Sequence, residues 1–217
     1  MNARAEPSDV TQNSEEPEAL SALRRFTRAR PPVERCELCG AALEPVHPHL
    51  LHRESRQITC SCDACSLLFC AQEGRKYLRI PRRTRQLHDF AFNDLEWEAM
   101  MLPIHLAFFL RDASGKIAAM YPSPAGAVAS QLGMDSLERK FAELPALQRM
   151  EPEVETLLVN RNGDGSYYIV PIDECYRLVG LIRTRWRGLS GGTELWAGIE
   201  EFFRELKQRS NPGTNHA

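Results

Sequence analysis

The stretches Cys36-Glu37-Leu38-Cys39-Gly40 and Cys60-Ser61-Cys62-Asp63-Ala64-Cys65 contain the most specific signal in the chain. Each holds a Cys-x2-Cys pair, and residues 40–61 separate the two pairs. Two cysteines on one tight turn can both reach a metal ion at about 2.3 Å, and two such turns complete a tetrahedron of thiolates. Gly40 suits such a turn, because glycine tolerates positive φ. The spacing predicts a structural zinc site in a zinc-ribbon-like module, with the ligands Cys36, Cys39, Cys62 and Cys65.

Three further residues are alternative ligands: Cys60, Cys70 and His49. Cys60 is near enough in sequence to replace Cys62. His47 and His49 point the same way if their segment is extended, and could then form a second metal site with Cys60. We favour the more ordinary interpretation, in which the histidines are surface or packing residues and Cys70 is a small buried apolar residue.

Iron is the competing metal. Four thiolates also suit a single iron, and the run from Cys60 to Cys70 offers enough cysteines for an iron–sulfur cluster. None of these spacings is a standard ferredoxin pattern. We therefore predict zinc, with an iron-binding electron-transfer protein as the alternative function.

The composition excludes several classes of protein. With 217 residues, 43% of them hydrophobic and 26% charged, the chain is neither collagen-like nor wholly disordered. A net charge of −2 argues against a globally cationic nucleic-acid binder. The most apolar run, residues 100–110, is too short to span a bilayer, and the first twenty residues do not resemble a signal peptide. We expect a cytoplasmic protein, in which clustered cysteines favour metal binding over disulfides.

The organisation along the chain predicts an α+β fold. We expect a disordered acidic tail at 1–18, a short helix and linker at 19–32, the metal module at 33–86, an α+β domain at 87–208 and a disordered tail at 209–217. Two β-hairpins are expected within that domain, at 104–121 and 155–170. Helices are expected at 123–133, where Ser123 and Pro124 resemble a helix start, at 135–144, and in two segments that begin near Asp173 and Thr193.

A basic stretch follows the cysteines. Its six cations, with no acid among them, are Arg75, Lys76, Arg79, Arg82, Arg83 and Arg85. They predict a docking surface for an acidic protein partner, although a solvated edge strand would look the same. Nucleic-acid binding is a weaker alternative, because Tyr77 is the only aromatic residue there that could stack on a base.

Cys175 is the one cysteine outside the module. In a helix capped by Asp173 it would lie near the N-terminus, where backbone amides favour a reactive thiolate. Val179 and Ile182 share its face, however, which favours core packing. We favour a protein without enzymatic activity, and the alternative is an enzyme in which Cys175 is a reactive thiol.

The chain resembles a bacterial family of unknown function over residues 33–207. The matching stretches are the two cysteine motifs, His49-Leu50-Leu51, residues 121–127 and residues 170–176. Genes of that family lie near those of the high-affinity, actinobacterial type of uptake [NiFe] hydrogenase. The resemblance implies a zinc-binding accessory or assembly protein that contacts a hydrogenase subunit or maturation factor.

Overall fold

The computed structural model describes residues 33–71, 74–130, 134–163, 165–188 and 190–210. The expected tail at 1–18, the segment at 19–32 and residues 211–217 lie outside the described residues. By its internal contacts the chain divides into residues 1–34 and residues 35–217, and every element below belongs to the second unit. No helix in the described part is long and apolar enough to cross a bilayer.

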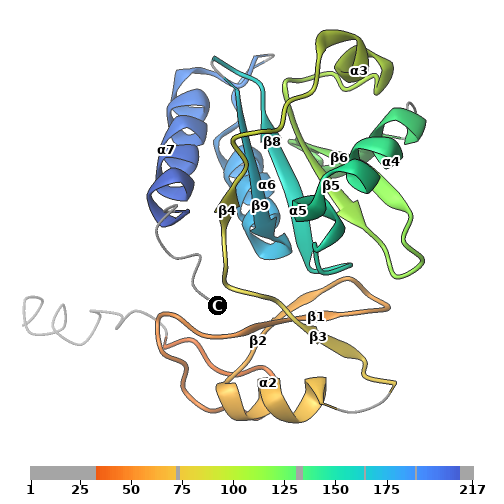
Figure 1. The fold of residues 1–217 in the computed structure, drawn as a ribbon. Helices are drawn as coiled ribbons and strands as arrows, with labels where there is room; N and C mark the ends of the chain where they lie inside the picture. Colours follow the sequence, from red (N-terminus) through yellow and green to blue (C-terminus); the bar gives the residue numbers. More distant parts are fainter. Residues whose placement is uncertain (1–32, 72–73, 131–133, 164, 189, 211–217) are drawn as a thin grey trace, which may run out of the picture. The chain divides into compact units, whose positions relative to one another are not determined.

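Residues 35–80, here called the cysteine module, contain a small antiparallel sheet and one helix (Figure 1). The strands are β1 (His49–His52), β2 (Ile58–Cys60) and β3 (Tyr77–Arg79), in the order β2-β1-β3. The helix is α2 (Asp63–Cys70). Central strand β1 supplies Leu50 and Leu51, which are both fully buried.

Residues 85–210, here called the sheet domain, are built on a six-stranded antiparallel sheet in the order β4-β9-β8-β5-β6-β7. Its strands are β4 (Arg85–Gln86), β5 (Leu106–Arg111), β6 (Ile117–Ser123), β7 (Gly126–Ser130), β8 (Glu155–Asn160) and β9 (Ser166–Pro171). The two predicted hairpins are present as β5–β6 and β8–β9.

Helices cover both faces of this sheet. One apolar cluster joins α3 (Asp94–Ala99), α4 (Met134–Glu143) and α5 (Pro145–Gln148) to Ala107 and Phe109 of β5. A second joins α6 (Ile172–Arg185) and α7 (Thr193–Arg209) to Leu106 and Phe108 of the same strand. Because strand side chains alternate between faces, β5 has to be apolar at nearly every position. The fold is α+β, with antiparallel sheets.

The helix expected at 123–133 is wrong. Strand β6 continues to Ser123, and the chain turns back at once into β7, which pairs with it. The Ser123 hydroxyl donates to the carbonyl of Gly126 and accepts from the amide of Ala125, so that it stabilises a hairpin turn. The same hydroxyl chemistry serves helix caps and tight turns, which is why the sequence pattern was misread.

The cysteine module packs against the sheet domain. Leu51 and Ile80 form a third buried cluster with Leu110, Val154 and Ile172. Charged contacts flank that cluster: Arg53 and Arg56 bind the Glu153 carboxylate, with N–O distances of 3.2 and 2.9 Å. The two sheets therefore share a core that neither would bury alone.

Candidate metal centre

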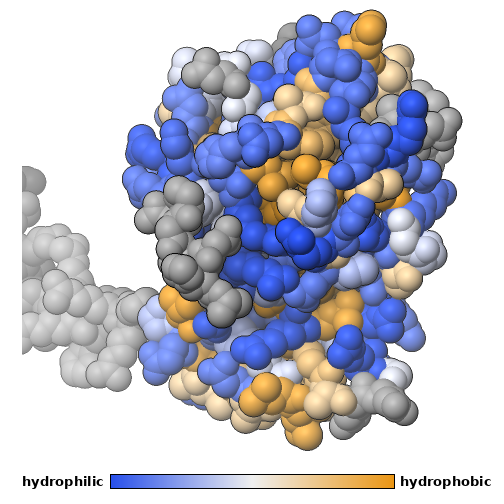
Figure 2. Space-filling model, viewed as in Figure 1, coloured by the Kyte–Doolittle hydropathy of each residue, from blue (hydrophilic) through white to orange (hydrophobic). Residues whose placement is uncertain are grey.

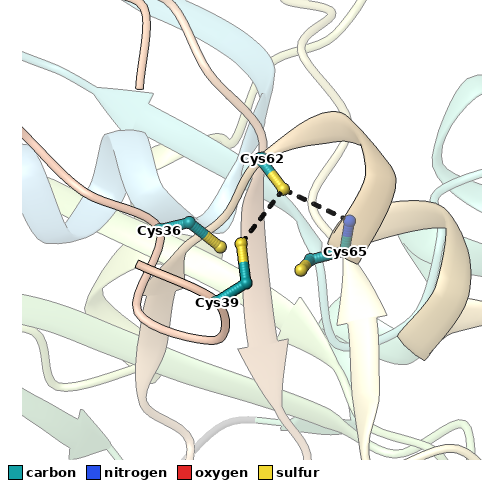
Figure 3. A group of neighbouring side chains, drawn as sticks. All are labelled: Cys36, Cys39, Cys62 and Cys65. Carbon is teal, nitrogen blue, oxygen red and sulfur yellow. Dashed lines mark hydrogen bonds between the residues drawn. The ribbon is translucent and has the colours of Figure 1, made fainter. Parts of the chain in front are cut away.

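Four cysteine side chains from two distant segments converge on one point. The sulfurs of Cys36, Cys39, Cys62 and Cys65 all lie within 4.8 Å of one another. Figure 3 shows them pointing toward a common centre, with 3.7 Å between the sulfurs of Cys39 and Cys62. The structure thus brings together the four residues that the two Cys-x2-Cys spacings predicted.

The first cysteine pair lies on a tight turn. The Gly40 amide donates to the Cys36 carbonyl at 2.7 Å, and the Cys36 amide donates to the Ala41 carbonyl at 2.8 Å. Gly40 has a φ of 76°, in the left-handed region that side chains disfavour. This bend lets both sulfurs of the pair face the same side.

The second pair lies at the start of α2, a helix that the sequence analysis did not predict. Cys62 is the N-cap residue, and its sulfur accepts a hydrogen bond from the Cys65 amide at 3.4 Å. The unpaired amides and the dipole at a helix N-terminus favour negative charge. The N-terminal end of α2 therefore fixes the position of both sulfurs of the second pair.

Glu37 connects the two pairs. Its amide donates to the Cys60 carbonyl at 3.0 Å, and its carboxylate accepts from the Cys60 amide at 2.7 Å. This two-way bond holds the first turn against the strand that leads into the second pair. No spacing rule in the sequence pointed to this role of Glu37.

The thiols affect one another's ionisation. Burial opposes ionisation of Cys36, but hydrogen bonds from the backbone amides of Cys62, Leu38 and Cys39 lower its pKa to about 6. Burial, followed by the neighbouring thiols, raises the pKa of Cys65 to about 12. Four sulfurs this close cannot all carry charge without a cation between them, because like charges repel. A thiophilic divalent ion is the natural cation for such a set.

The alternative ligands lie elsewhere. Cys60 groups with His47 and His49, whose ligand atoms also lie within 4.8 Å of one another. Cys70, at the end of α2, belongs to neither group of candidate ligands in the described residues. Burial raises the pKa of the Cys70 thiol. A cluster that used Cys60, Cys62, Cys65 and Cys70 together is not favoured by this arrangement.

The six cations of the basic stretch do not share one environment. Arg83 bonds to the carboxylates of Glu155 and Glu151 at 2.9 and 2.6 Å, and Arg85 reaches the fully buried Glu155 at 3.3 Å. Arg83 is exposed despite these bonds, as are the other four cations, namely Arg75, Lys76, Arg79 and Arg82. Arg79 lies 3.7 Å from Asp63 of α2. A docking role for the stretch stays a prediction.

Cys175 lies in the core. Its thiol lies on α6, fully buried in the apolar cluster that α6 and α7 form with the sheet, and the Thr156 hydroxyl oxygen is 3.0 Å away. Burial raises the pKa of this thiol well above its usual range. This environment suits the packing role that the sequence analysis favoured over a nucleophile.

Comparison with known proteins adds a family but no activity. A family model described as "Family of unknown function (DUF5947)" matches residues 35–210, which include the whole cysteine module and the sheet domain. Searches of curated proteins and of solved structures found no match.

Proposed function

Because this chain belongs to DUF5947, a family of unknown function, its role has to be argued from its own residues, and we propose that it is a zinc-binding accessory protein that acts through protein contacts. One observation carries the proposal: four cysteine sulfurs from two separate turns lie within 4.8 Å of one another. Four thiolates fill the coordination sphere of zinc and leave no position for substrate. A metal held in this way stabilises a fold and activates no water.

The local architecture supports zinc over an iron–sulfur cluster. A tight turn, the β1–β2 hairpin and the N-terminus of α2 follow one another, so that the two ligand pairs come from two separate hydrogen-bonded turns. The carboxylate and amide of Glu37 fix the relative position of the two ligand pairs. One tetrahedral ion needs only these four sulfurs, whereas the two nearest spare cysteines lie outside the group.

Helix α2 supports a role in docking. Leu67 and Leu68 lie on α2, two and three residues after the ligand Cys65, and they are 61% and 59% exposed. Figure 2 shows apolar surface in the region of α2, bordered by hydrophilic residues. Arg75, Lys76 and Arg82 are exposed near it in sequence. An apolar centre with a cationic rim suits a protein partner that carries an apolar groove edged with acids.

We further propose that this partner is a [NiFe] hydrogenase subunit or maturation factor, and that the protein acts in the cytoplasm. The support is the gene neighbourhood that the resemblance implies and the preference of a four-thiol site for a reducing compartment. The geometry of the four-cysteine site supports zinc binding, and the hydrogenase partner rests on the resemblance alone.

Two measurements test these proposals. Protein purified without oxygen should be colourless and should hold zinc without iron; a coloured protein with iron would instead indicate the electron-transfer alternative. In a strain that carries the hydrogenase genes, tagged protein should recover a hydrogenase component, and the Leu67→Ser/Leu68→Ser variant should not. Leu95→Ser is the matched control, because Leu95 is 78% exposed but lies on α3. Recovery of no hydrogenase component by the wild type would contradict the partner.

A further inference from the structure

A second group of metal-binding side chains lies on the cysteine module. His47, His49 and Cys60 are each half-buried, and their candidate ligand atoms lie within 4.8 Å of one another. The imidazole rings of His47 and His49 meet edge to face, with centroids 5.0 Å apart. None of the three belongs to the four-cysteine set.

The sheet register explains why these side chains meet. His49 of β1 lies directly opposite Cys60 of β2, so that both project from the same face. Leu51 lies two residues further along β1, opposite Ile58, and faces the sheet domain through the third apolar cluster. The His–Cys group therefore continues the face by which the module contacts the domain.

Hydrogen bonds orient both imidazole rings. The Nδ1 atom of His49 lies 2.7 Å from a carboxylate oxygen of Asp173, and Nδ1 of His47 lies 2.9 Å from the carbonyl oxygen of Glu44. Both partners can only accept a hydrogen bond, so each Nδ1 carries the proton. A neutral ring then has its lone pair on Nε2. Histidines that bind metals through one nitrogen usually donate from the other to such an oxygen.

We propose that His47, His49 and Cys60 bind one late first-row divalent ion, zinc by default, through the two Nε2 atoms and the Cys60 sulfur. Imidazole with thiolate selects zinc, cobalt, nickel or copper over magnesium or calcium. Three protein ligands leave a fourth position for water or for a group from another molecule. This site is thus open, in contrast to the closed four-cysteine site.

Asp173 connects this second metal site to the sheet domain. It lies at the first turn of α6 in the sheet domain, while the three ligands belong to the cysteine module. The orientation of His49 therefore depends on the contact between module and domain. Removal of an orienting carboxylate typically weakens metal binding by about 10–100-fold. The Asp173→Asn variant should therefore have an affinity for the second ion that is lower by this factor.

The test counts zinc in the full chain, reduced and dialysed to equilibrium against buffered Zn²⁺. Wild-type protein should bind two equivalents, one tightly and one more weakly. The His47→Gln/Cys60→Ser variant should lose the weaker equivalent and keep the tight one. His52→Gln/Cys70→Ser is the matched control, because it removes one histidine and one cysteine of the same module, and it should keep both.

Cobalt provides a second measurement. In wild-type protein already holding one zinc, added Co²⁺ should produce the absorption of a site with a single thiolate, and His47→Gln/Cys60→Ser should abolish it. One equivalent in the wild type, or no difference between the variant and the wild type, would overturn the proposal. An unchanged second dissociation constant in Asp173→Asn would contradict the orienting role of Asp173. The four-cysteine set is intact in every variant, so failure of this site is distinguishable from failure of the structural zinc.

Discussion

The cysteine module and the sheet domain are held together in different ways. The domain buries apolar side chains on both faces of its sheet: Phe108 faces α6 and α7, and Phe109 faces α3, α4 and α5. Among the described residues of the module, the buried aliphatic side chains are Leu50, Leu51 and Ile80, and two of these contact the domain. Units this small rarely bury enough surface to fold alone, and a metal commonly supplies the difference. The contrast predicts that the domain depends on burial and that the module depends on the metal ion that its four cysteines could hold.

Removal of the metal should produce the largest difference in behaviour between the cysteine module and the sheet domain. Structural zinc contributes about 10–16 kcal/mol in small zinc modules. Chelation of reduced protein should therefore release the amides of β1 and β2 to rapid hydrogen exchange, while those of β5 and β8 stay protected. Exchange followed by mass spectrometry measures both regions in one sample.

Cys36→Ser should have the same effect as chelation, because it leaves only three thiolates to hold the ion. Cys70→Ser is the control and should leave exchange unchanged, since Cys70 lies outside both ligand groups. If β1 stays protected after complete metal removal, the module folds on burial alone and the contrast fails.

The converse test removes one large side chain from the core of the sheet domain. Phe108 is 1% exposed, and truncation of a buried phenylalanine to alanine typically costs about 3–5 kcal/mol. Phe108→Ala should lower the free energy of unfolding in urea by that amount, and the folded variant should keep its full metal content. Phe69→Ala, on a half-exposed residue of the module, should cost much less. Loss of zinc from folded Phe108→Ala would show that the core of the domain also maintains the ligand geometry.

The sequence predicted those features in which a local pattern determines the structure. Cys-x2-Cys pairs with Gly40 specify a turn and a ligand set, and alternation around residues 104–110 specifies a strand. Features that depend on distant partners were missed. His49 and Asp173 are 124 residues apart, and no periodicity joins them.

Helix α2 was missed for a related reason. It has only eight residues, and Cys62 caps it through a sulfur, outside the usual set of capping side chains. At 123–130 the pattern was present but ambiguous, because a serine before a proline suits a turn as well as a helix. Pairing of residues 126–130 with β6 favours the turn over the helix.

A partly buried carboxylate, that of Glu174, should make the stability of the domain depend on pH. Burial alone would raise the pKa of Glu174, but the guanidinium groups of Arg209 and Arg177, at 2.6 and 2.9 Å, lower it below the usual value. A depressed folded-state pKa contributes stability above the unfolded value of about 4.3, and this contribution is lost as the pH falls through the folded-state pKa.

Glu174→Gln should therefore cost about 1–3 kcal/mol at pH 7, and the difference from wild type should shrink below about pH 4. Urea unfolding of both proteins at each pH measures this difference. Because both proteins have the same metal site, the effect of acid on that site cancels in the difference. Glu205→Gln is the control, because its carboxylate is 43% exposed and forms an ion pair with the exposed Arg177. A constant difference from pH 7 to pH 3 would argue against the charge as the cause.

The smallest effects should have opposite signs in the two regions. Gly40, in the first ligand turn, has a φ of 76°, and a side chain there costs about 1–2 kcal/mol although nothing lies within 4 Å of the added Cβ. Gly180 lies inside α6 with ordinary helical φ and equally open space, where alanine should stabilise by about 0.5–1 kcal/mol. Gly40→Ala should therefore lower the affinity for zinc roughly 5–30-fold, as measured by competition with a chelator. Gly180→Ala should raise the urea midpoint and leave zinc affinity unchanged. Because neither substitution removes a contact, the pair isolates backbone strain, and equal zinc affinity in both variants would show that the turn at Gly40 adds nothing to metal binding.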